Sequence, residues 1–360
     1  MTKKKIIFTV TNDLVYDQRM QRICGTLAEK YDVTLIGRVL KNNQLTNQLY
    51  NQKRFDCYFS KGKLFYAEIN LRIFFFLLFS KVDIIGAIDL DTIVPAFLVS
   101  KLRNKTLVYD AHEYYTQVIE LIDRPLEQSI WLKIEEFILP KVKHAYTVSE
   151  SLQKLYTDKY NIPFELIRNI APLKPKIEKT SQEKYLIYIG AVNAGRGISE
   201  LLYAMKEISL PLHICGEGDL LDEMKQLSIQ LNVQNKVVFH GNVLPEPLRK
   251  LTANAFAGFL LLENKGLSYY YSLANKFFDY IHGEIPQITI NFPEYQLINN
   301  QIEVALLIDL QPNHIVAAVN KLINDPELYR TLKDNCKIAK HEYSWQTESQ
   351  RLISYYEQIK

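Results

Sequence analysis

The chain has 360 residues, of which 48% are hydrophobic, 23% charged and 12% aromatic. A single hydrophobic core stops growing at roughly 250–300 residues, so this length predicts a globular protein of two domains. The formal net charge of +3 is too small to indicate binding to nucleic acid. The cysteines lie far apart in sequence, which excludes CxxC metal or redox pairs and favours a reducing compartment. They are Cys24, Cys57, Cys215 and Cys336.

The first half of the chain alternates short apolar runs with amphipathic segments. Residues 6–10 form an apolar run that is too short for the core of a signal peptide, and we predict a buried strand there. Apolar strands that alternate with helices predict a mostly parallel sheet covered on both faces. Further strands are expected at residues 33–36, 83–87, 106–109, 145–148 and 164–167, and helices at 18–30, 92–102, 126–140 and 150–160.

Residues 73–79 form a second apolar run, in a segment that begins near Arg72. Spanning a bilayer takes about 20 residues, so this run is too short to cross one. A helix that faces the core or the ligand cleft is the first interpretation. The neighbouring Arg72 and Lys81 leave open a helix whose surface contacts a membrane. We therefore predict a cytoplasmic protein that is at most peripheral to the membrane.

Residues 171–184 are polar, contain two prolines and show no periodicity, which is typical of a linker. The alternation then restarts, so we predict one domain at 1–172 and another at 173–340, with a helix at 341–360 that packs back on the first. Two doubly wound units in tandem predict a ligand crevice between them, at the carboxyl ends of their strands. Strands are expected at 185–189, 212–215, 236–239, 256–261, 286–290 and 304–307, and helices at 197–206, 219–231, 247–251, 273–282, 314–323 and along the tail from 325.

Residues 259–293 contain a strand, a polar loop and a helix with a carboxylate near its middle, Asp279. The free N–H groups and the dipole of a helix amino terminus favour bound anions. Ser272, Asn275 and Lys276 lie at that terminus, and the ammonium group of Lys276 adds a formal positive charge. Asp279, one turn further on, is placed to accept hydrogen bonds from ribose hydroxyls. An ordinary surface helix is the alternative interpretation.

A glycine-rich loop joins a strand to a helix between residues 185 and 204. Gly190 and Gly195 permit close approach of the backbone to a phosphate, and Asn193 lies between them. Arg196 supplies a forked, permanently charged donor that suits a diphosphate. A second glycine-containing turn, GEGDL, follows the next strand, and its Glu217 is a candidate contact for a nucleotide base.

Residues 259–293 resemble the "S-x-P-N-K-x-F-E-Y" motif of bacterial glycosyltransferase family 4, the group 1 enzymes. Residues 185–204 resemble the "G-R-L-x-x-x-K-G" motif of the same family. The resemblance implies a GT-B fold: α/β, with two Rossmann-like doubly wound domains, a deep interdomain cleft and a helical carboxyl-terminal tail. It also implies that residues 272–276 and Arg196 face a donor diphosphate and that Asp279 binds the ribose. The chain departs from the family at Tyr271, where a glutamate is usual, and at Ala191, where the first of two basic residues is usual.

The first half is expected to bind the acceptor, at polar residues that follow strand ends. Asp89 and Asp91 have the D-x-D spacing of a metal site, but we expect no metal there, and Asp91 is also placed to cap the next helix. His112 lies in a turn that resembles the family's "H-D/E" turn, which implies contact with the donor sugar. The residues predicted to contact the acceptor are Asp13, Asp17, Gln18 and Arg19.

The resemblance implies transfer of a sugar from a UDP- or GDP-type donor to a saccharide or lipid-linked acceptor, with retention, in surface polysaccharide or glycolipid synthesis. His112, Arg196 and Lys276 are the predicted catalytic residues, and neither a cofactor nor a metal is expected. Two alternatives remain open. The differences at positions 191 and 271 favour a non-catalytic scaffold that binds sugar nucleotides, and the shared fold allows a nucleotide-sugar 2-epimerase.

Overall fold

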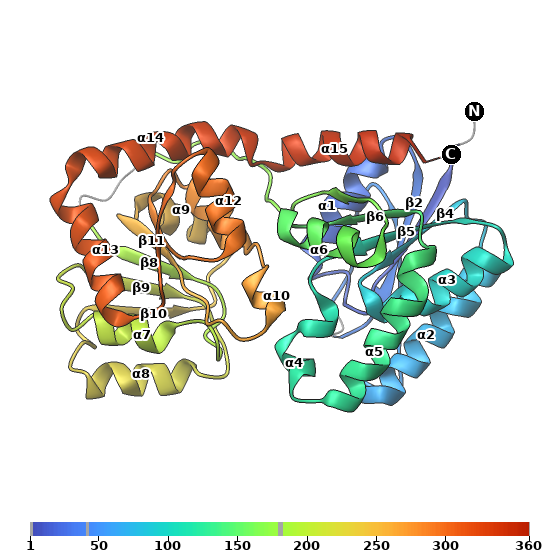
Figure 1. The fold of residues 1–360 in the computed structure, drawn as a ribbon, viewed down its shortest axis with the longest axis horizontal. Helices are drawn as coiled ribbons and strands as arrows, with labels where there is room; N and C mark the ends of the chain where they lie inside the picture. Colours follow the sequence, from blue (N-terminus) through green and yellow to red (C-terminus); the bar gives the residue numbers. More distant parts are fainter. Residues whose placement is uncertain (1–2, 41–42, 179–182, 360) are drawn as a thin grey trace. The chain divides into compact units, whose positions relative to one another are not determined.

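The computed structural model describes residues 3–40, 43–178 and 183–359 (Figure 1). It separates into two compact units that are each built around one sheet. Unit 1 contains the described residues up to Asn169 together with those from Glu348 onward, and unit 2 contains Ile170–Thr347. Unit 1 is therefore discontinuous in sequence, with unit 2 inserted between its two parts.

Unit 1 contains a seven-stranded sheet in the order β3-β2-β1-β4-β5-β6-β7, with every neighbouring pair parallel. The central strands are buried along almost their whole length, which explains their continuous apolar sequences. A Cβ atom on Gly86 would lie 2.2 Å from the ring of Phe8, so only glycine fits between these two strands. The strands are β1 Lys5–Thr9, β2 Asp32–Arg38, β3 Asn51–Phe55, β4 Ile84–Ile88, β5 Thr106–Ala111, β6 His144–Thr147 and β7 Phe164–Leu166.

Two helices of unit 1, α1 and α6, begin with a side-chain cap. The side chain of Asp17 accepts from the backbone N–H of Met20 at the start of α1, and that of Ser149 accepts from Leu152 at the start of α6. The helix expected at 92–102 is preceded by a 3-10 turn, η1. The helices are α1 Gln18–Leu27, α2 Gly62–Phe79, η1 Leu90–Thr92, α3 Ile93–Leu102, η2 Tyr115–Gln117, α4 Ile119–Ile122, α5 Pro125–Ile138, η3 Leu139–Lys141 and α6 Glu150–Tyr160.

The end of the chain contributes to unit 1 through α15, Trp345–Glu357. The buried carboxylate of Glu348 accepts a 2.9 Å hydrogen bond from the backbone N–H of Arg168. Tyr356 is fully buried, with its ring 6.2 Å from that of Phe8 on β1 and 6.3 Å from that of Tyr146 on β6. The last helix therefore covers apolar side chains of the sheet made from the first half of the chain.

Unit 2 repeats the architecture with a six-stranded parallel sheet in the order β10-β9-β8-β11-β12-β13. Its strands are β8 Leu186–Ile189, β9 Leu212–Cys215, β10 Val237–Gly241, β11 Ala257–Leu260, β12 Gln287–Ile290 and β13 Ala305–Ile308. Its helices are α7 Ile198–Ala204, α8 Leu221–Gln230, α9 Pro245–Asn254, α10 Leu267–Tyr270, α11 Asn275–His282, α12 Pro293–Gln301, α13 Pro312–Asn324 and α14 Pro326–Glu342.

The predicted architecture of two Rossmann-like sheets with a helical tail is confirmed. The sequence analysis did not predict β3, because its sequence NQKRF has no buried apolar residue and lies at the sheet edge. Part of the predicted linker, residues 179–182, lies outside the described residues. In the part of the chain that the structure describes, no helix is both long enough and apolar enough to cross a membrane.

Candidate functional site

In unit 2 the strand order reverses between β8 and β11, the position at which open α/β sheets bind ligands. The glycine-rich loop follows β8, and the loop that leads to α11 follows β11. The two loops are joined by backbone and side-chain hydrogen bonds. The N–H of Gly195 donates to Oε1 of Glu263 at 3.1 Å, and the N–H of Glu263 donates to the carbonyl of Gly195 at 3.0 Å. Glu263 therefore stabilises the glycine-rich loop.

The glycine-rich loop has a conformation that side chains rarely permit. Gly190, Gly195 and Gly197 have φ values of 128°, 81° and 63°. The following glycine turn packs directly beneath it, because a Cβ atom on Gly216 would lie only 1.9 Å from the carbonyl oxygen of Gly190. Asn193 is held there too, since its Oδ1 accepts from the N–H of Asp219 at 2.9 Å.

Two cations, Arg196 and Lys276, lie beside this loop. Lys276 is only 8% exposed, and its Nζ atom lies 4.0 Å from the ring centre of Tyr188 and would lie 3.2 Å from a Cβ atom on Gly190. The guanidinium carbon of Arg196 lies 5.1 Å from the ring centre of Tyr269. Nε of Arg196 and Nζ of Lys276 are both buried without a hydrogen-bond partner among the described residues.

The pKa of Lys276 shows how unfavourable this position is for a positive charge. Burial, and then the charge of Arg196, lower the pKa to about 7, against the attraction of Asp279. No ion pair is formed by either cation within the described residues. A bound anion would accept hydrogen bonds from both nitrogens and offset the repulsion between the two charges. Anion binding at this position of unit 2 stays a prediction.

The remaining residues predicted to bind the donor surround the two cations or the neighbouring turn. Asn275 is the first residue of α11, and Asp279 lies on the next turn of the same helix. The hydroxyl of Ser272 donates to the carbonyl of Tyr269 at 2.8 Å. Glu217 is exposed in the turn after β9 and lies beside Gly241. Their contacts with a nucleotide stay predictions.

In unit 1 the corresponding reversal lies between β1 and β4, and a charged network follows β5 nearby. Nε2 of His112 lies 2.9 Å from Oδ2 of Asp110, and its Nδ1 lies 3.5 Å from Asp89. Asp110 also accepts a 2.9 Å hydrogen bond from Arg19. Burial lowers the pKa of His112, but the charges of Asp110 and Asp89 outweigh it and raise the pKa to about 9. The two carboxylates therefore favour the imidazolium form of His112.

Several predicted acceptor residues have internal partners. Asp13 is fully buried, accepts from the N–H groups of Val15 and Leu40, and forms an ion pair with Arg54. Arg19 is 4% exposed and pairs with Asp110, and Asp17 accepts from the N–H of Met20 at the start of α1, where Gln18 is the first residue. These internal contacts explain why charged residues occur at positions 13, 17 and 19. Contact of these residues with an acceptor stays a prediction.

Asp91 does not cap α3, contrary to one interpretation of the sequence. The residue before α3 is Thr92, and no side chain caps that helix. The carboxylate of Asp91 instead accepts a hydrogen bond from the hydroxyl of Thr11, the second residue after β1. Among the described residues, no group of three or more His, Cys, Asp or Glu side chains is arranged to hold a metal ion.

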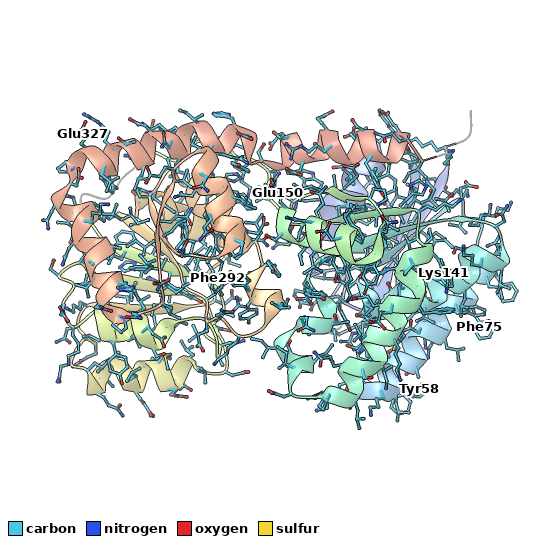
Figure 2. The ribbon with its side chains drawn as sticks, viewed as in Figure 1. Tyr58, Phe75, Lys141, Glu150, Phe292 and Glu327 are labelled. Carbon is cyan, nitrogen blue, oxygen red and sulfur yellow. The ribbon has the colours of Figure 1, made fainter. Side chains whose placement is uncertain are left out.

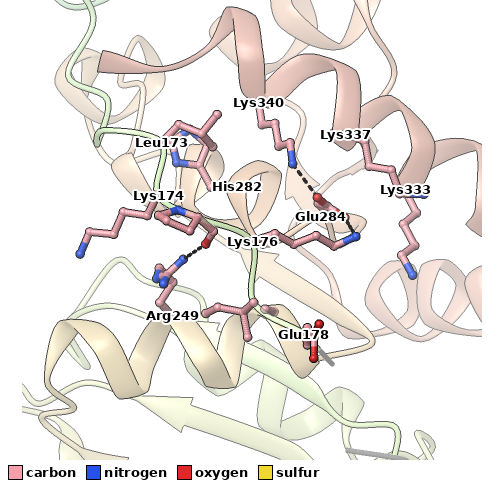
Figure 3. Close-up of a pocket in the computed structure, with 14 residues that line it drawn as sticks. Leu173, Lys174, Lys176, Glu178, Arg249, His282, Glu284, Lys333, Lys337 and Lys340 are labelled. Carbon is pink, nitrogen blue, oxygen red and sulfur yellow. Dashed lines mark hydrogen bonds and ion pairs between the residues drawn. The ribbon is translucent and has the colours of Figure 1, made fainter. Parts of the chain in front are cut away.

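A cavity of about 350 Å³ lies elsewhere in unit 2, and several lysine side chains and Arg249 line it (Figure 3). Glu284 accepts a 2.6 Å hydrogen bond from Lys340 and lies 3.7 Å from Lys176, and Arg249 donates to the carbonyl of Pro175. The cavity contains none of the residues predicted to bind a donor or an acceptor. We therefore assign neither ligand to it.

Residues 169–338 match the model of the family described as glycosyl transferases group 1. Among curated proteins, the chain is similar to an uncharacterised glycosyltransferase of Methanocaldococcus jannaschii, with 38% identity over 20% of each chain. It is also similar to the O-antigen chain mannosyltransferase of Salmonella typhimurium, with 24% identity over 43% of this chain and 45% of that protein. The matches thus span less than half the length of either relative.

Two solved structures share the fold along the whole chain. A sucrose-phosphate synthase from Thermosynechococcus elongatus has a TM-score of 0.79 and 17% identity, covering 99% of both chains. The Anabaena protein HepE, in complex with UDP and glucose, has a TM-score of 0.77 and 12% identity, covering 99% of this chain and 100% of that one. The two structural likenesses show a shared GT-B fold, and the family model covers residues 169–338 of the chain.

Proposed function

We propose that the protein transfers a sugar from a nucleotide diphosphate sugar, UDP or GDP type, to a saccharide or lipid-linked acceptor. The observation that carries the proposal is the pair of cations, Arg196 and Lys276, beside the glycine-rich loop with unpartnered buried nitrogens. A donor diphosphate supplies the anion that both side chains lack. It also explains the glycines, which leave the backbone N–H groups of the loop open to phosphate oxygens.

Lys276 compensates for the absence of a basic residue at position 191. Its Nζ atom lies beside Gly190, the residue before Ala191, so the positive charge reaches the loop from α11 instead of from the loop itself. As the bond between the sugar and the diphosphate breaks, negative charge develops on the leaving oxygens. Arg196, Lys276 and the amino terminus of α11 would stabilise that charge without a metal ion.

The other roles follow from position and from the family match. Asp279 binds the ribose, Glu217 lies near the base, and Ser272, Asn193 and Asn275 contact the donor. The protonated His112 faces the donor sugar, and the acceptor attacks from the side that the diphosphate leaves, which gives retention. The similarity to an O-antigen mannosyltransferase supports a role in surface polysaccharide or glycolipid synthesis.

Donor binding is tested with a panel of UDP and GDP sugars and a thermal-shift measurement, because a ligand that binds only the folded state raises Tm. We expect one donor to raise Tm and to be converted to free nucleotide by the wild-type protein. Arg196→Ala is expected to abolish both effects, whereas Lys225→Ala, on the exposed surface of α8, is expected to leave them unchanged. Failure of every donor to bind would overturn the proposal, and binding without turnover would favour the scaffold.

Peripheral membrane contact is also part of the proposal, through unit 1. Helix α2 is apolar on nearly all sides, yet Phe75 and Phe79 are 49% and 80% exposed, and Tyr58 just before it is 91% exposed (Figure 2). Helix α3 packs beside α2 and adds exposed Leu98 and Leu102. A helix that is hydrophobic all round but partly exposed suits an apolar partner such as a lipid surface.

Vesicle sedimentation tests this contact. The wild-type protein is expected to pellet with vesicles that contain phosphatidylglycerol, and the double substitution Phe75→Ser and Phe79→Ser is expected to stay in the supernatant. Leu244→Ser, at a 72% exposed leucine of unit 2, serves as the control and should pellet like the wild type. Equal sedimentation of all three proteins would contradict the membrane role of α2.

A further inference from the structure

A second group of polar and aromatic side chains lies in unit 1, at the reversal of strand order between β1 and β4. The turn η1 packs against both α2 and α5, which brings side chains from six separate segments to the carboxyl ends of these strands. None of them belongs to the donor position of unit 2. The group, called here the aromatic–carboxylate cluster, consists of Thr11, Arg38, Tyr66, Asn70, Asp91, Tyr115 and Trp131.

The polar half of the cluster is centred on Asp91. Its carboxylate accepts from Thr11, and its backbone carbonyl accepts a 2.9 Å hydrogen bond from Nδ2 of Asn70. Two further polar atoms, Oδ1 of Asn70 and Nε of Arg38, are buried without a hydrogen-bond partner among the residues that the structure describes. Buried polar atoms of this kind are unfavourable unless a ligand or a water satisfies them.

The aromatic half consists of three half-buried rings. The ring centre of Trp131 lies 5.6 Å from that of Tyr66 and 5.3 Å from that of Tyr115, with interplanar angles of 77° and 73°. The hydroxyls of Tyr115 and Tyr66 form a hydrogen bond with each other. Edge-to-face packing orients the rings and leaves part of each accessible.

The chemistry of the cluster fits an uncharged polyol with an apolar face. A pyranose ring has C–H groups on its faces, which pack on aromatic rings, and hydroxyls on its rim, which need donors and acceptors. The carboxylate of Asp91 and the guanidinium of Arg38 carry opposite charges, so the cluster does not select a strongly anionic ligand. Burial raises the pKa of Asp91 to about 6, against the hydrogen bond from Thr11, so the carboxylate accepts hydrogen bonds at neutral pH.

We propose that the aromatic–carboxylate cluster binds the sugar ring of the acceptor, with Trp131, Tyr66 and Tyr115 against its apolar face and Asp91 accepting from its hydroxyls. This inference rests on the proposed function, because it assigns the acceptor subsite of the same enzyme. It requires that the end of the acceptor that reacts with the donor is a sugar. Asp91 is one of the polar residues after strand ends where the sequence predicts acceptor contacts, whereas the cluster contains none of Asp13, Asp17, Gln18 and Arg19.

Tryptophan fluorescence tests the inference without relying on activity. The chain has two tryptophans, so Trp345→Phe leaves Trp131 as the only tryptophan, and excitation is set where tyrosine does not absorb. Methyl glycosides of glucose, galactose, mannose and N-acetylglucosamine are titrated into this variant, with and without UDP. At least one glycoside is expected to give a saturable change. Adding Asp91→Asn is expected to weaken that binding at least tenfold, whereas adding Asp158→Asn, on the exposed surface of α6, is expected to leave it unchanged.

A second variant keeps the test decisive if Asp91→Asn fails to fold. Tyr66→Leu removes a half-buried ring and is expected to weaken glycoside binding by a similar factor while the donor-induced rise in Tm persists. The inference is overturned if no glycoside of the panel binds, or if Asp91→Asn and Asp158→Asn bind equally well. Loss of the donor-induced Tm shift in the wild-type protein would instead contradict the proposed function, and the fluorescence titration reports independently of it.

Discussion

At the scale of single residues, Lys276 has the clearest conflict between stability and binding. Its ammonium group is buried beside Arg196, and its pKa is lowered to about 7. An unfolded lysine has a pKa near about 10.4, so between pH 7 and 10 the unfolded chain binds one more proton than the folded protein. The free energy of unfolding contributed by this group therefore rises with pH across that window.

Lys276→Met is expected to stabilise the donor-free protein at pH 7 by an amount on the order of a few kcal/mol, because it removes the unfavourable burial of a charge. The same substitution is expected to abolish the donor-induced rise in Tm. Urea unfolding of the variant and the wild type is measured at pH 7 and at pH 9.5. The difference between their free energies of unfolding should be large at pH 7 and smaller at pH 9.5. Lys225→Met, on an exposed surface, is the control, and a destabilised Lys276→Met protein would refute the argument.

His112 has the opposite pH dependence. Its pKa of about 9 lies above the value of about 6.5 for an unfolded histidine, so its contribution to stability is fully present below pH 6.5. That contribution is lost as the pH rises through 9. His112→Gln is expected to lower stability by about 1–3 kcal/mol at pH 6 and by much less at pH 10. Urea unfolding at both pH values checks this, and an equal loss at the two values would show that Asp110 and Asp89 do not stabilise the imidazolium.

At the scale of elements, the turn after β9 determines the shape of the glycine-rich loop. A methyl group on Gly216 would overlap the carbonyl of Gly190, and one on Gly218 would lie 2.4 Å from the carbonyl of Val192. The two turns therefore fit together only because these positions lack side chains. The contact shows that the glycines of this turn position the glycine-rich loop.

Gly216→Ala is expected to destabilise the protein by about 1–3 kcal/mol, the usual cost of overpacking, and to weaken donor binding because the Gly190 loop has to move. Gly25→Ala is the matched control. No atom lies within 4 Å of a Cβ atom there, and a helical alanine is favoured over glycine by roughly 0.5–1 kcal/mol, so this variant should be slightly more stable. Thermal unfolding measures the change in stability, and the donor-induced Tm shift measures the change in donor binding. Unchanged donor binding in Gly216→Ala would show that the turn at Gly216 does not position the glycine-rich loop for the donor.

Sequence patterns predicted most elements but only part of the sites. The buried strands are continuous apolar runs, so their positions follow from hydrophobicity alone. The residues proposed to bind the donor lie in two local motifs, so glycines, a lysine and an arginine near helix starts are sufficient to propose them from the sequence. Trp131, Tyr66 and Asp91 are far apart in sequence, and each alone looks like a core or surface residue. Only the packing of η1 against α2 and α5 brings them together.

At the scale of the whole molecule, the chain returns to unit 1 at its end. Tyr356 on α15 is fully buried and contacts rings of β1 and β6. Tyr356→Ala is expected to destabilise unit 1 by about 3–5 kcal/mol, as for other large aromatic-to-alanine changes in a core. Tyr58→Ala, at a 91% exposed tyrosine, should change stability by less than about 0.5 kcal/mol.

Calorimetry distinguishes the units, because domains with separate cores unfold in separate transitions. A bound donor should raise the Tm of the unit 2 transition, which identifies it. Tyr356→Ala should lower only the Tm of the unit 1 transition. A variant that lowers both transitions equally would show that the two units unfold as one.

The order of synthesis gives this discontinuous unit an unusual folding schedule. Domains generally fold as they emerge from the ribosome, the amino-terminal one first. Here the sheet of unit 1 receives helix α15 only after all of unit 2 has been made. Until then, the apolar surface that Tyr356 covers is exposed on the nascent chain. A stop codon shortly before α15 would therefore damage unit 1, although it spares every residue of that unit's sheet.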